Sequence, residues 1–196
     1  RYQKAAWQGG LTAYRNSVSN LIQSVLVNPA TYTYAAENVG SATLQGVTLQ
    51  AGWQGKIFNA GGSFDWLDAR DSSGSDMDGK RLARRARHSG TLYVGAKQGS
   101  WQARAELEAH GDRFDDAANN NRLGGYSLVN LSAAWQATKN WRVEAKLNNL
   151  FDKRLYREGN AVSVSNTAIY GTSGGAGAAT YNEPGRAYWA SLRFGF

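Results

Sequence analysis

The stretch that decides the fold is Tyr188 to Phe196 (YWASLRFGF), in which every second residue is apolar. Side chains of a β-strand point alternately to its two faces, so the apolar residues share one face. One such strand is ordinary in a water-soluble sheet. A whole chain of them, joined by alternately short and long connections, is typical of a transmembrane β-barrel with lipid outside and a polar lumen inside.

The same alternation recurs upstream, in Val47 to Trp53, Phe58 to Trp66, Trp101 to Ala109 and Trp141 to Leu147. The polar faces of these segments carry many charges, and buried ions are costly in a sandwich core unless they are paired. A wet or ion-paired lumen explains the pattern better. The charged residues expected to face this lumen are Arg104, Glu106, Glu108, Arg142, Glu144 and Lys146.

The composition agrees with membrane-spanning strands. The chain has 196 residues, of which 42% are hydrophobic, and it contains no apolar run of the roughly 20 residues that a membrane helix needs. Seven Trp and ten Tyr are many for this length, and several stand where strands should end, as interfacial aromatic girdles do. Those Trp residues are Trp53, Trp66, Trp101, Trp135 and Trp141.

The connections suggest an orientation. Tight turns are expected at 54–56, 98–100 and 137–140, and long polar stretches at 71–80, 115–124 and 158–184. Bacterial barrels have short periplasmic turns and long external loops. The chain is therefore predicted to form one domain, 1–196, of about eight antiparallel strands, the first of which project beyond the membrane. The expected spans are 5–26, 32–54, 56–70, 82–98, 100–114, 124–137, 140–157 and 182–196.

Two motifs near the C-terminus carry a family resemblance. Asn149 to Ala161 (NLFDKRLYREGNA) and Gly175 to Trp189 (GAGAATYNEPGRAYW), followed by a strand that ends in Phe, resemble the C-terminus of TonB-dependent outer-membrane receptors. The longer pieces are most similar to the ferric enterobactin class of catecholate siderophore receptors. Glu37 to Val47 and Lys80 to Gly90 are also similar to the vitamin B12 receptor branch.

The resemblance implies that the chain is the last third or so of a receptor whose barrel has about 22 strands around an N-terminal plug. No residue here matches the plug or the TonB box. The implied activity is active transport of a ferric siderophore of the catecholate type across the bacterial outer membrane, energised by TonB through the missing plug. Iron would enter only as part of that cargo, with no resident cofactor and no catalysis. Outer-membrane lipid, lipopolysaccharide and the barrel-assembly machinery are the other implied partners.

The candidate ligand residues follow from the chemistry of that cargo. A ferric tris-catecholate is an anion with aromatic rings, so its site should combine Arg or Lys with Tyr or Trp. The candidates are Arg81, Arg85, Tyr156, Arg157, Tyr170 and Tyr181. By alternation with Leu92, the segment from Lys80 should place Arg85 and Arg87 inward and Arg84 and His88 outward, where cations suit lipopolysaccharide phosphates.

The motifs themselves are expected to be structural. NLFDK should end a strand at the outer interface, and Arg186 of YNEPGR is expected to pair with Asp152 or with lipopolysaccharide phosphates. His88 and His110 are isolated, so no metal site is predicted. The chain has no cysteine for a disulfide framework or a thiolate metal site.

Other classes of protein fit less well. The net charge of +7 is spread over strands rather than gathered on one face, which argues against nucleic-acid binding. A cobalamin receptor and a free-standing eight-stranded barrel with a structural or adhesive role remain open alternatives. An outer-membrane hydrolase is disfavoured because no Ser and His pair is visible.

Overall fold

The computed structural model describes residues 2–4, 6–20, 22–28, 33–38, 40–120, 122–153, 156–164, 177–182 and 185–195. Side chains are described in all of these ranges except 22–28, 33–38, 156–164 and 177–182. Every regular element within them is a β-strand with antiparallel neighbours. The predicted all-β antiparallel fold is therefore confirmed. No helix in the described ranges is long and apolar enough to cross a bilayer.

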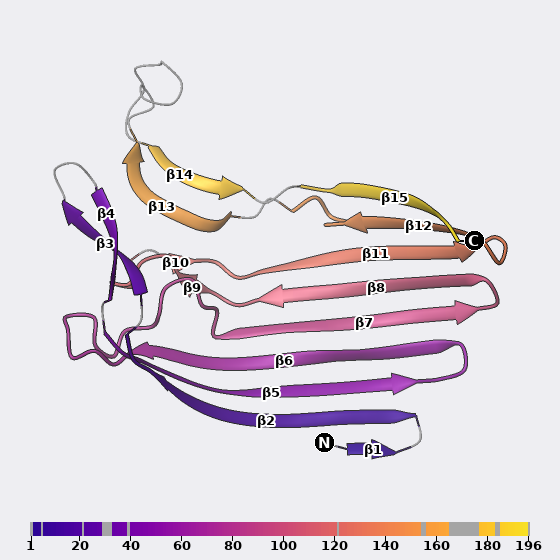
Figure 1. The fold of residues 1–196 in the computed structure, drawn as a ribbon, viewed down its shortest axis with the longest axis horizontal. Helices are drawn as coiled ribbons and strands as arrows, with labels where there is room; N and C mark the ends of the chain where they lie inside the picture. The colour runs from indigo at the N-terminus through magenta and orange to yellow at the C-terminus, as the bar shows by residue number, and fades with distance from the viewer. Residues whose placement is uncertain are drawn as a thin grey trace.

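One nine-stranded sheet, in the order β1-β2-β5-β6-β7-β8-β11-β12-β15, makes up most of the molecule (Figure 1). Eight of its members are the predicted long strands, and the short β1 is an addition at one edge. The strands are β1 (Tyr2–Lys4), β2 (Trp7–Val18), β5 (Ala42–Gln54), β6 (Phe58–Asp71), β7 (His88–Gln98), β8 (Trp101–His110), β11 (Tyr126–Gln136), β12 (Trp141–Asn148) and β15 (Ala187–Phe194).

Three short hairpins lie apart from this sheet, at the end away from its tight turns (Figure 1). Each forms a two-stranded sheet of its own. They pair β3 (Ile22–Asn28) with β4 (Thr33–Asn38), β9 (Arg113–Phe114) with β10 (Arg122–Leu123), and β13 (Tyr156–Val164) with β14 (Gly177–Asn182). This end is called the loop end below, and the opposite end the turn end.

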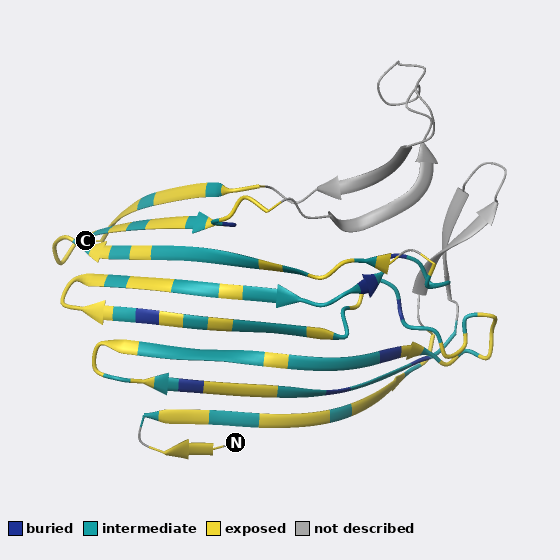
Figure 2. Ribbon diagram, turned by 180° about the vertical axis from the view of Figure 1, so that it is seen from behind, coloured by how far each residue is buried: buried dark blue, intermediate teal, exposed yellow. Residues whose placement is uncertain are grey.

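The register of the main sheet keeps apolar side chains in rows across one face. Leu49, for example, lies between Leu11 on one side and Phe64 on the other. This outward face is open: Leu11 is 69% exposed and Leu92 is 62% exposed. Figure 2 accordingly shows exposed and intermediate residues along the long strands, with few buried positions. A sheet with one exposed apolar face and one polar face is the arrangement expected of a barrel wall that faces lipid.

Aromatic pairs lie on the outward face at the turn end, as the girdle interpretation predicts. Their ring centroids are 4.6–6.4 Å apart across neighbouring strands. Of these pairs, Trp101 and Trp135 are stacked, with centroids 5.3 Å apart and an angle of 11° between the rings. The pairs are Trp7–Trp53, Trp101–Trp135 and Trp141–Phe194.

Two predicted strands are wrong in their length. The spans 5–26 and 32–54 were expected to run unbroken, but β2 ends at Val18 and β5 begins at Ala42. Asn20 has φ of 59°, a left-handed conformation that breaks the pleat of a strand. The chain therefore leaves the main sheet there, and β3 and β4 pair only with each other in the described part of the chain.

The predicted strand 82–98 begins later, at His88, because residues 83–86 bulge away from β6, between the backbone hydrogen bonds that join Leu82 to Ala69 and Leu67 to Arg87. Arg81 still bridges Arg70, and His88 still pairs with Trp66. Between these two pairs, the segment that leads into β7 has more residues than the part of β6 that faces it. Within this segment, Arg84 adopts φ of 60°. The bulge packs Leu82 onto Ala42 and Ala69, which form a small buried cluster at the loop end. Strand alternation therefore cannot orient residues 84–87.

Other boundaries move by a few residues for similar reasons. β8 ends at His110 and β12 at Asn148, short of the predicted 114 and 157. The long stretch 158–184 contains the β13–β14 hairpin, which the sequence did not predict. The predicted tight turns are confirmed, and in 98–100 the turn is made by Gly99, whose φ is 56°.

Candidate functional site

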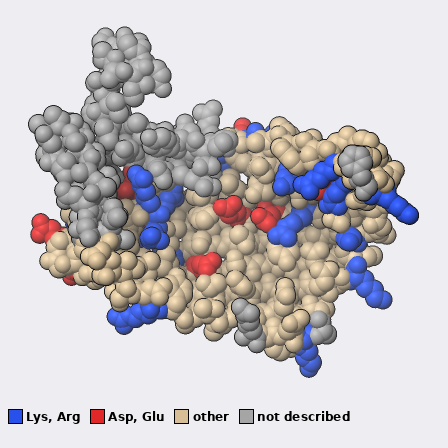
Figure 3. All heavy atoms as spheres, in the orientation of Figure 1, with Lys and Arg blue, Asp and Glu red and all other residues tan. Residues whose placement is uncertain are grey.

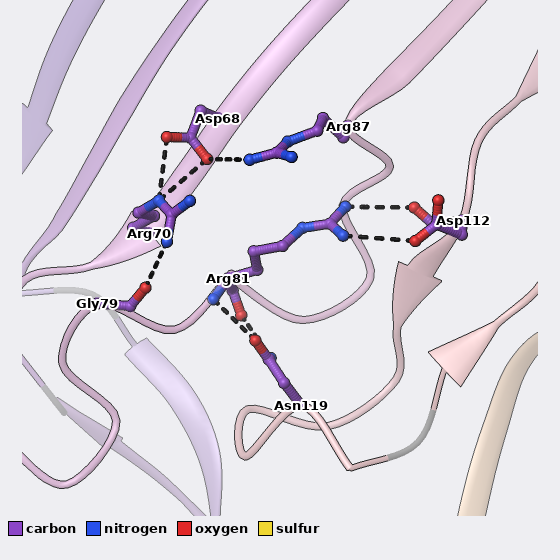
Figure 4. Close-up of polar contacts among 7 residues, drawn as sticks. All are labelled: Asp68, Arg70, Gly79, Arg81, Arg87, Asp112 and Asn119. Atoms are coloured by element: carbon purple, nitrogen blue, oxygen red, sulfur yellow. Dashed lines mark hydrogen bonds and ion pairs between the residues drawn. The ribbon is translucent and has the colours of Figure 1, made fainter.

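The loop end brings two long connections together into one polar cluster (Figure 4). One connection follows β6, and the other follows β8. The cluster is defined here as the loop-end cluster, with the members Asp68, Arg70, Arg81, Arg87, Asp112 and Asn119.

Asp68 neutralises two of its arginines. Arg70 Nε donates to Asp68 Oδ2 at 3.0 Å, and Arg87 Nη2 lies 3.4 Å from Asp68 Oδ1. Arg70 also donates through Nη1 to the carbonyl of Gly79 at 2.8 Å, which holds the loop against the strand end. Asp68 lies on the outward face because it follows Trp66 by two residues on β6. The predicted inward direction of Arg87 stays a prediction, because the contact with Asp68 places the guanidinium and not the face from which the side chain leaves the backbone.

Asp112 neutralises two more arginines. Arg122 Nε donates to Asp112 Oδ2 at 3.1 Å, and Arg81 Nη1 lies 3.5 Å from the same oxygen. The hydrogen bond from Arg122 is the largest influence on the pKa of Asp112. Partial burial opposes it, but together with the positive charges of Arg122 and Arg81 it holds this pKa below its ordinary value.

The bulge itself is held by the second loop. Arg84 donates its backbone N–H to the carbonyl of Phe114 at 2.6 Å. Its guanidinium Nε lies 3.1 Å from Oδ1 of Asp115, whose side chain is buried. The Arg81 guanidinium lies over the Phe114 ring, 5.3 Å from the centroid. These contacts hold Arg81 and Arg84 against β9.

The predicted ligand residues fall into three groups. Arg81 is half-buried and already bonded to Asp112, whereas Arg85 is exposed and has no hydrogen bond or ion pair among the described side chains. Tyr156, Arg157 and Tyr181 lie on the β13–β14 hairpin, where Tyr156 pairs with Asn182 and Glu158 with Tyr181. Tyr170 lies outside the described residues.

The hairpin and the arginine segment are linked through the second loop. β9 holds Arg84, β10 pairs with β9, and β10 lies beside β13. The structure therefore gathers the described candidates at one end of the sheet, although it shows no direct contact between Arg85 and the hairpin.

Sequence reasoning missed the residues that organise this cluster. Asp112 and Asn119 are essential to it, but their partner Arg81 lies 31 and 38 residues away in the sequence. Arg122 joins the cluster through Asp112, which precedes it by ten residues in the same connection. The polar stretch 115–124 was the only signal, and it indicated a loop without indicating a partner. Among the described residues, no three His, Cys, Asp or Glu side chains are grouped so that they could hold a metal ion.

The NLFDK motif is a structural turn. Asn149 is 4% exposed, and its amide makes two bonds of 2.8 Å with the backbone of Lys153. Asp152 Oδ1 accepts the backbone N–H of Arg186 at 2.7 Å. The expected contact between Arg186 and Asp152 is thus present, but through the Arg186 backbone rather than its guanidinium.

An open antiparallel wall, apolar outside, polar inside and crowned by charged loops, is the architecture of part of a large membrane barrel. Residues 1–150 match the family described as TonB dependent receptor-like, beta-barrel. The chain belongs to this family.

Its relatives are receptors and transporters. The chain is 32% identical to the vitamin B12 transporter BtuB of Photobacterium profundum over 166 residues, 83% of this chain and 26% of that protein. It is 29% identical to the ferrienterobactin receptor of Escherichia coli over 216 residues, which cover 100% of this chain and 28% of that protein. The chain thus spans between a quarter and a third of these curated relatives.

A solved structure shows the same architecture. The ferric enterobactin receptor of Pseudomonas aeruginosa, as a variant in complex with enterobactin, superimposes with a TM-score of 0.70 at 26% identity. The match covers 98% of this chain and 30% of that chain.

Proposed function

We propose that the protein carrying this chain is an outer-membrane receptor that takes up a ferric siderophore of the catecholate type, energised through TonB. The observation that carries the proposal is the family match together with similarity of the whole of this chain to 28% of a ferrienterobactin receptor. The open sheet, with β1 and β15 at its two edges, supports a piece of a larger barrel over a free-standing eight-stranded one.

The loop end supports an anionic cargo. Asp68 and Asp112 each contact two arginines, so the arginines outnumber the carboxylates within these two groups. Arg85 adds an exposed cation without a partner in the described side chains. Arginine offers five N–H donors and can also lie over aromatic rings, which suits catecholate oxygens and rings together. Tyr156, Arg157 and Tyr181 are proposed as further contacts from the β13–β14 hairpin, and Tyr170 and Arg81 as secondary ones.

Cobalamin is the second candidate cargo, because the vitamin B12 transporter is similar over 83% of this chain. The two cargoes differ in charge, since cobalamin carries no comparable negative charge. Binding of a ferric tris-catecholate should therefore weaken with added salt, whereas binding of cobalamin should not.

The deciding experiment is equilibrium binding to the full-length protein in detergent, with a ferric tris-catecholate and cyanocobalamin compared side by side. Saturable, salt-sensitive binding of the catecholate alone is the expected result. Saturable binding of cobalamin alone would overturn the proposed cargo and leave the receptor class intact. The proposed partners TonB, lipopolysaccharide and the barrel-assembly machinery need separate tests.

A further inference from the structure

The outward face of β2, β5 and β6 is apolar along most of its length and becomes charged only toward the loop end. The last apolar row on these strands consists of Ala13, Val47 and Trp66, and the next row consists of Arg15, Gln45 and Asp68. Arg70 follows Asp68 by two residues and shares its face. The inward face differs, because acidic and basic side chains lie over the middle of the sheet there (Figure 3). The outward charges of these three strands therefore lie at the edge of the apolar surface.

The carboxylate at this edge is contacted by two arginines (Figure 4). The Asp68 side chain is 12% exposed, whereas the side chains of Arg70 and Arg87 are 44% and 38% exposed. Arg70 Nε lies 3.1 and 3.0 Å from the two oxygens of Asp68, and Arg87 Nη2 lies 3.4 Å from one of them. A group that approaches from outside therefore meets guanidinium groups more readily than the carboxylate. The outward basic patch is defined here as Arg15, Arg70, Arg87 and Asp68.

The arginines of this patch keep donors available for a further acceptor. Each guanidinium has five N–H donors. Arg87 contacts Asp68 through Nη2 alone, and its buried Nε has no hydrogen-bond partner in the described part of the chain. Arg15 is exposed and makes no hydrogen bond or ion pair with any described side chain. Three arginines thus outnumber one carboxylate, which favours an anion at this place.

We propose that the outward basic patch binds the phosphate groups of lipopolysaccharide in the external leaflet, with its acyl chains against the apolar rows below. Leu11 and Leu49 in these rows are 69% and 51% exposed. Clusters of basic side chains at a membrane boundary attract anionic headgroups. Arg15 and Asp68 lie one strand apart from each other across β5, so their backbones are about 10 Å apart. Arginines spread over this width can contact two phosphate groups of one headgroup.

A lipid fits this place better than a free anion or the transported cargo. The patch adjoins an exposed apolar surface, which an acyl chain can cover and a free phosphate cannot. A cargo held by the external loops would not reach Arg15, because Arg15 lies within β2 on the lipid face. The proposal rests on the outer-membrane location given in the proposed function, but it does not depend on which cargo the receptor takes up.

The direct test is titration of purified lipopolysaccharide into the delipidated full-length protein in detergent, followed by native mass spectrometry. Saturable binding is expected, and lipopolysaccharide treated with phosphatase should bind about tenfold more weakly. Equal binding of the treated lipid would overturn the role of the phosphates. Displacement by an equal concentration of inorganic phosphate would reduce the patch to a free-phosphate site. Equally tight binding of phosphatidylglycerol would overturn the choice of lipid.

Two substitutions connect this binding to the patch. Changing Arg15→Gln and Arg87→Gln together should weaken lipopolysaccharide binding about tenfold or more. Asp68 would keep its contact with Arg70, so the barrel should still assemble, which resistance to SDS can verify. The single Arg15→Gln variant, expected to lose several-fold, keeps the test open if the double variant does not assemble. Unchanged affinity in an assembled variant would refute the patch.

The matched control is Lys56→Gln with Lys139→Gln, which removes the same charge from exposed residues at the turn end. This control should change lipopolysaccharide affinity less than twofold. An equal loss in both pairs would reduce the patch to a general effect of charge and overturn the proposal.

Binding of a ferric tris-catecholate to the same preparations separates this proposal from the proposed function. Arg15→Gln should lose lipid affinity and keep its affinity for the catecholate. Catecholate binding by an unchanged protein that does not bind lipopolysaccharide would refute the patch and leave the receptor intact. Lipopolysaccharide binding without catecholate binding would refute the proposed cargo and leave the patch intact.

Discussion

Asn119 holds the backbone of Arg81 from both sides. Its Oδ1 accepts the Arg81 N–H at 2.9 Å, and its Nδ2 donates to the Arg81 carbonyl at 2.9 Å. The Asn119 amide thus bonds the Arg81 backbone as a neighbouring strand would. The loop after β8 thereby supports Arg81, which lies before the start of β7. The position of the first predicted ligand arginine thus depends on a loop that contains no predicted ligand residue.

Replacing Asn119 by Ala should loosen this connection. The two hydrogen bonds to Arg81 are lost, at about 1 kcal/mol each, together with two longer ones to the carbonyls of Asp116 and Ala117. Local protection of the amides near Arg81 should fall accordingly. Hydrogen exchange of the full-length protein measures this protection. Asn120→Ala is the control, because Asn120 is exposed and its side chain is not part of the clamp. Equal protection in the two variants would contradict the clamp.

The arginine pair on Asp112 predicts a pH dependence. The folded-state pKa of Asp112 is lowered, so its contribution to loop stability is complete above the unfolded pKa of about 3.9 and is lost as pH falls through the lower folded value. A mobility label near Arg122 should stay ordered from pH 7 to 5 and loosen only below about 4. In the Asp112→Asn variant, the same label should be mobile over this whole pH range.

The control for this pH series is Asp76→Asn, which removes an exposed carboxylate from the first loop. It should leave the loosening below about pH 4 unchanged. Loosening that begins at about pH 6 in the unchanged protein would contradict the role given to Asp112.

Arg85 should contribute to cargo binding through charge. Arg85→Gln is expected to weaken ferric tris-catecholate binding several-fold at low salt and much less at high salt, because screening removes the attraction. The hairpin changes Arg157→Ala and Tyr181→Ala should act in the same direction. Arg15→Gln on the outward face of β2 is a matched loss of charge and should have no effect. Unchanged affinity in Arg85→Gln would remove this residue from the site.

The link between Asp152 and Arg186 should set the start of β15. A Cβ added at Gly185 would lie 2.6 Å from Asp152 Oδ1, so Gly185→Ala must displace the carboxylate from the Arg186 N–H. Asp152→Ala removes the same bond without adding an atom, at about 1 kcal/mol. Both should raise exchange of the first amides of β15 in the full-length protein. If only Gly185→Ala does so, the effect is steric and the bond contributes little.

The sequence predicted the main sheet because a period of two is visible in each strand alone. Trp101 to Ala109 needs no knowledge of its neighbours to be assigned a lipid face. The bulge at 83–86 was not predictable in this way, because it depends on Arg84 in a left-handed conformation and on a partner in the second loop.

The candidate site was predictable only in its residue types. Arginines beside tyrosines near long loops indicated an anionic ligand. The ion pair between Arg81 and Asp112 could not be predicted, because it forms only where the two connections meet in the folded chain. The roles of Arg85, Tyr156, Arg157, Tyr170 and Tyr181 stay predictions.

The aromatic pairs at the turn end have a mechanical consequence. Trp7–Trp53, Trp101–Trp135 and Trp141–Phe194 all lie close to the tight connections, and rings of this kind settle at the boundary between hydrocarbon and headgroups. In a bilayer these rings would fix the position of the sheet along the membrane normal from its turn end. A change of shape at the loop end would then leave the depth of the sheet in the membrane unchanged.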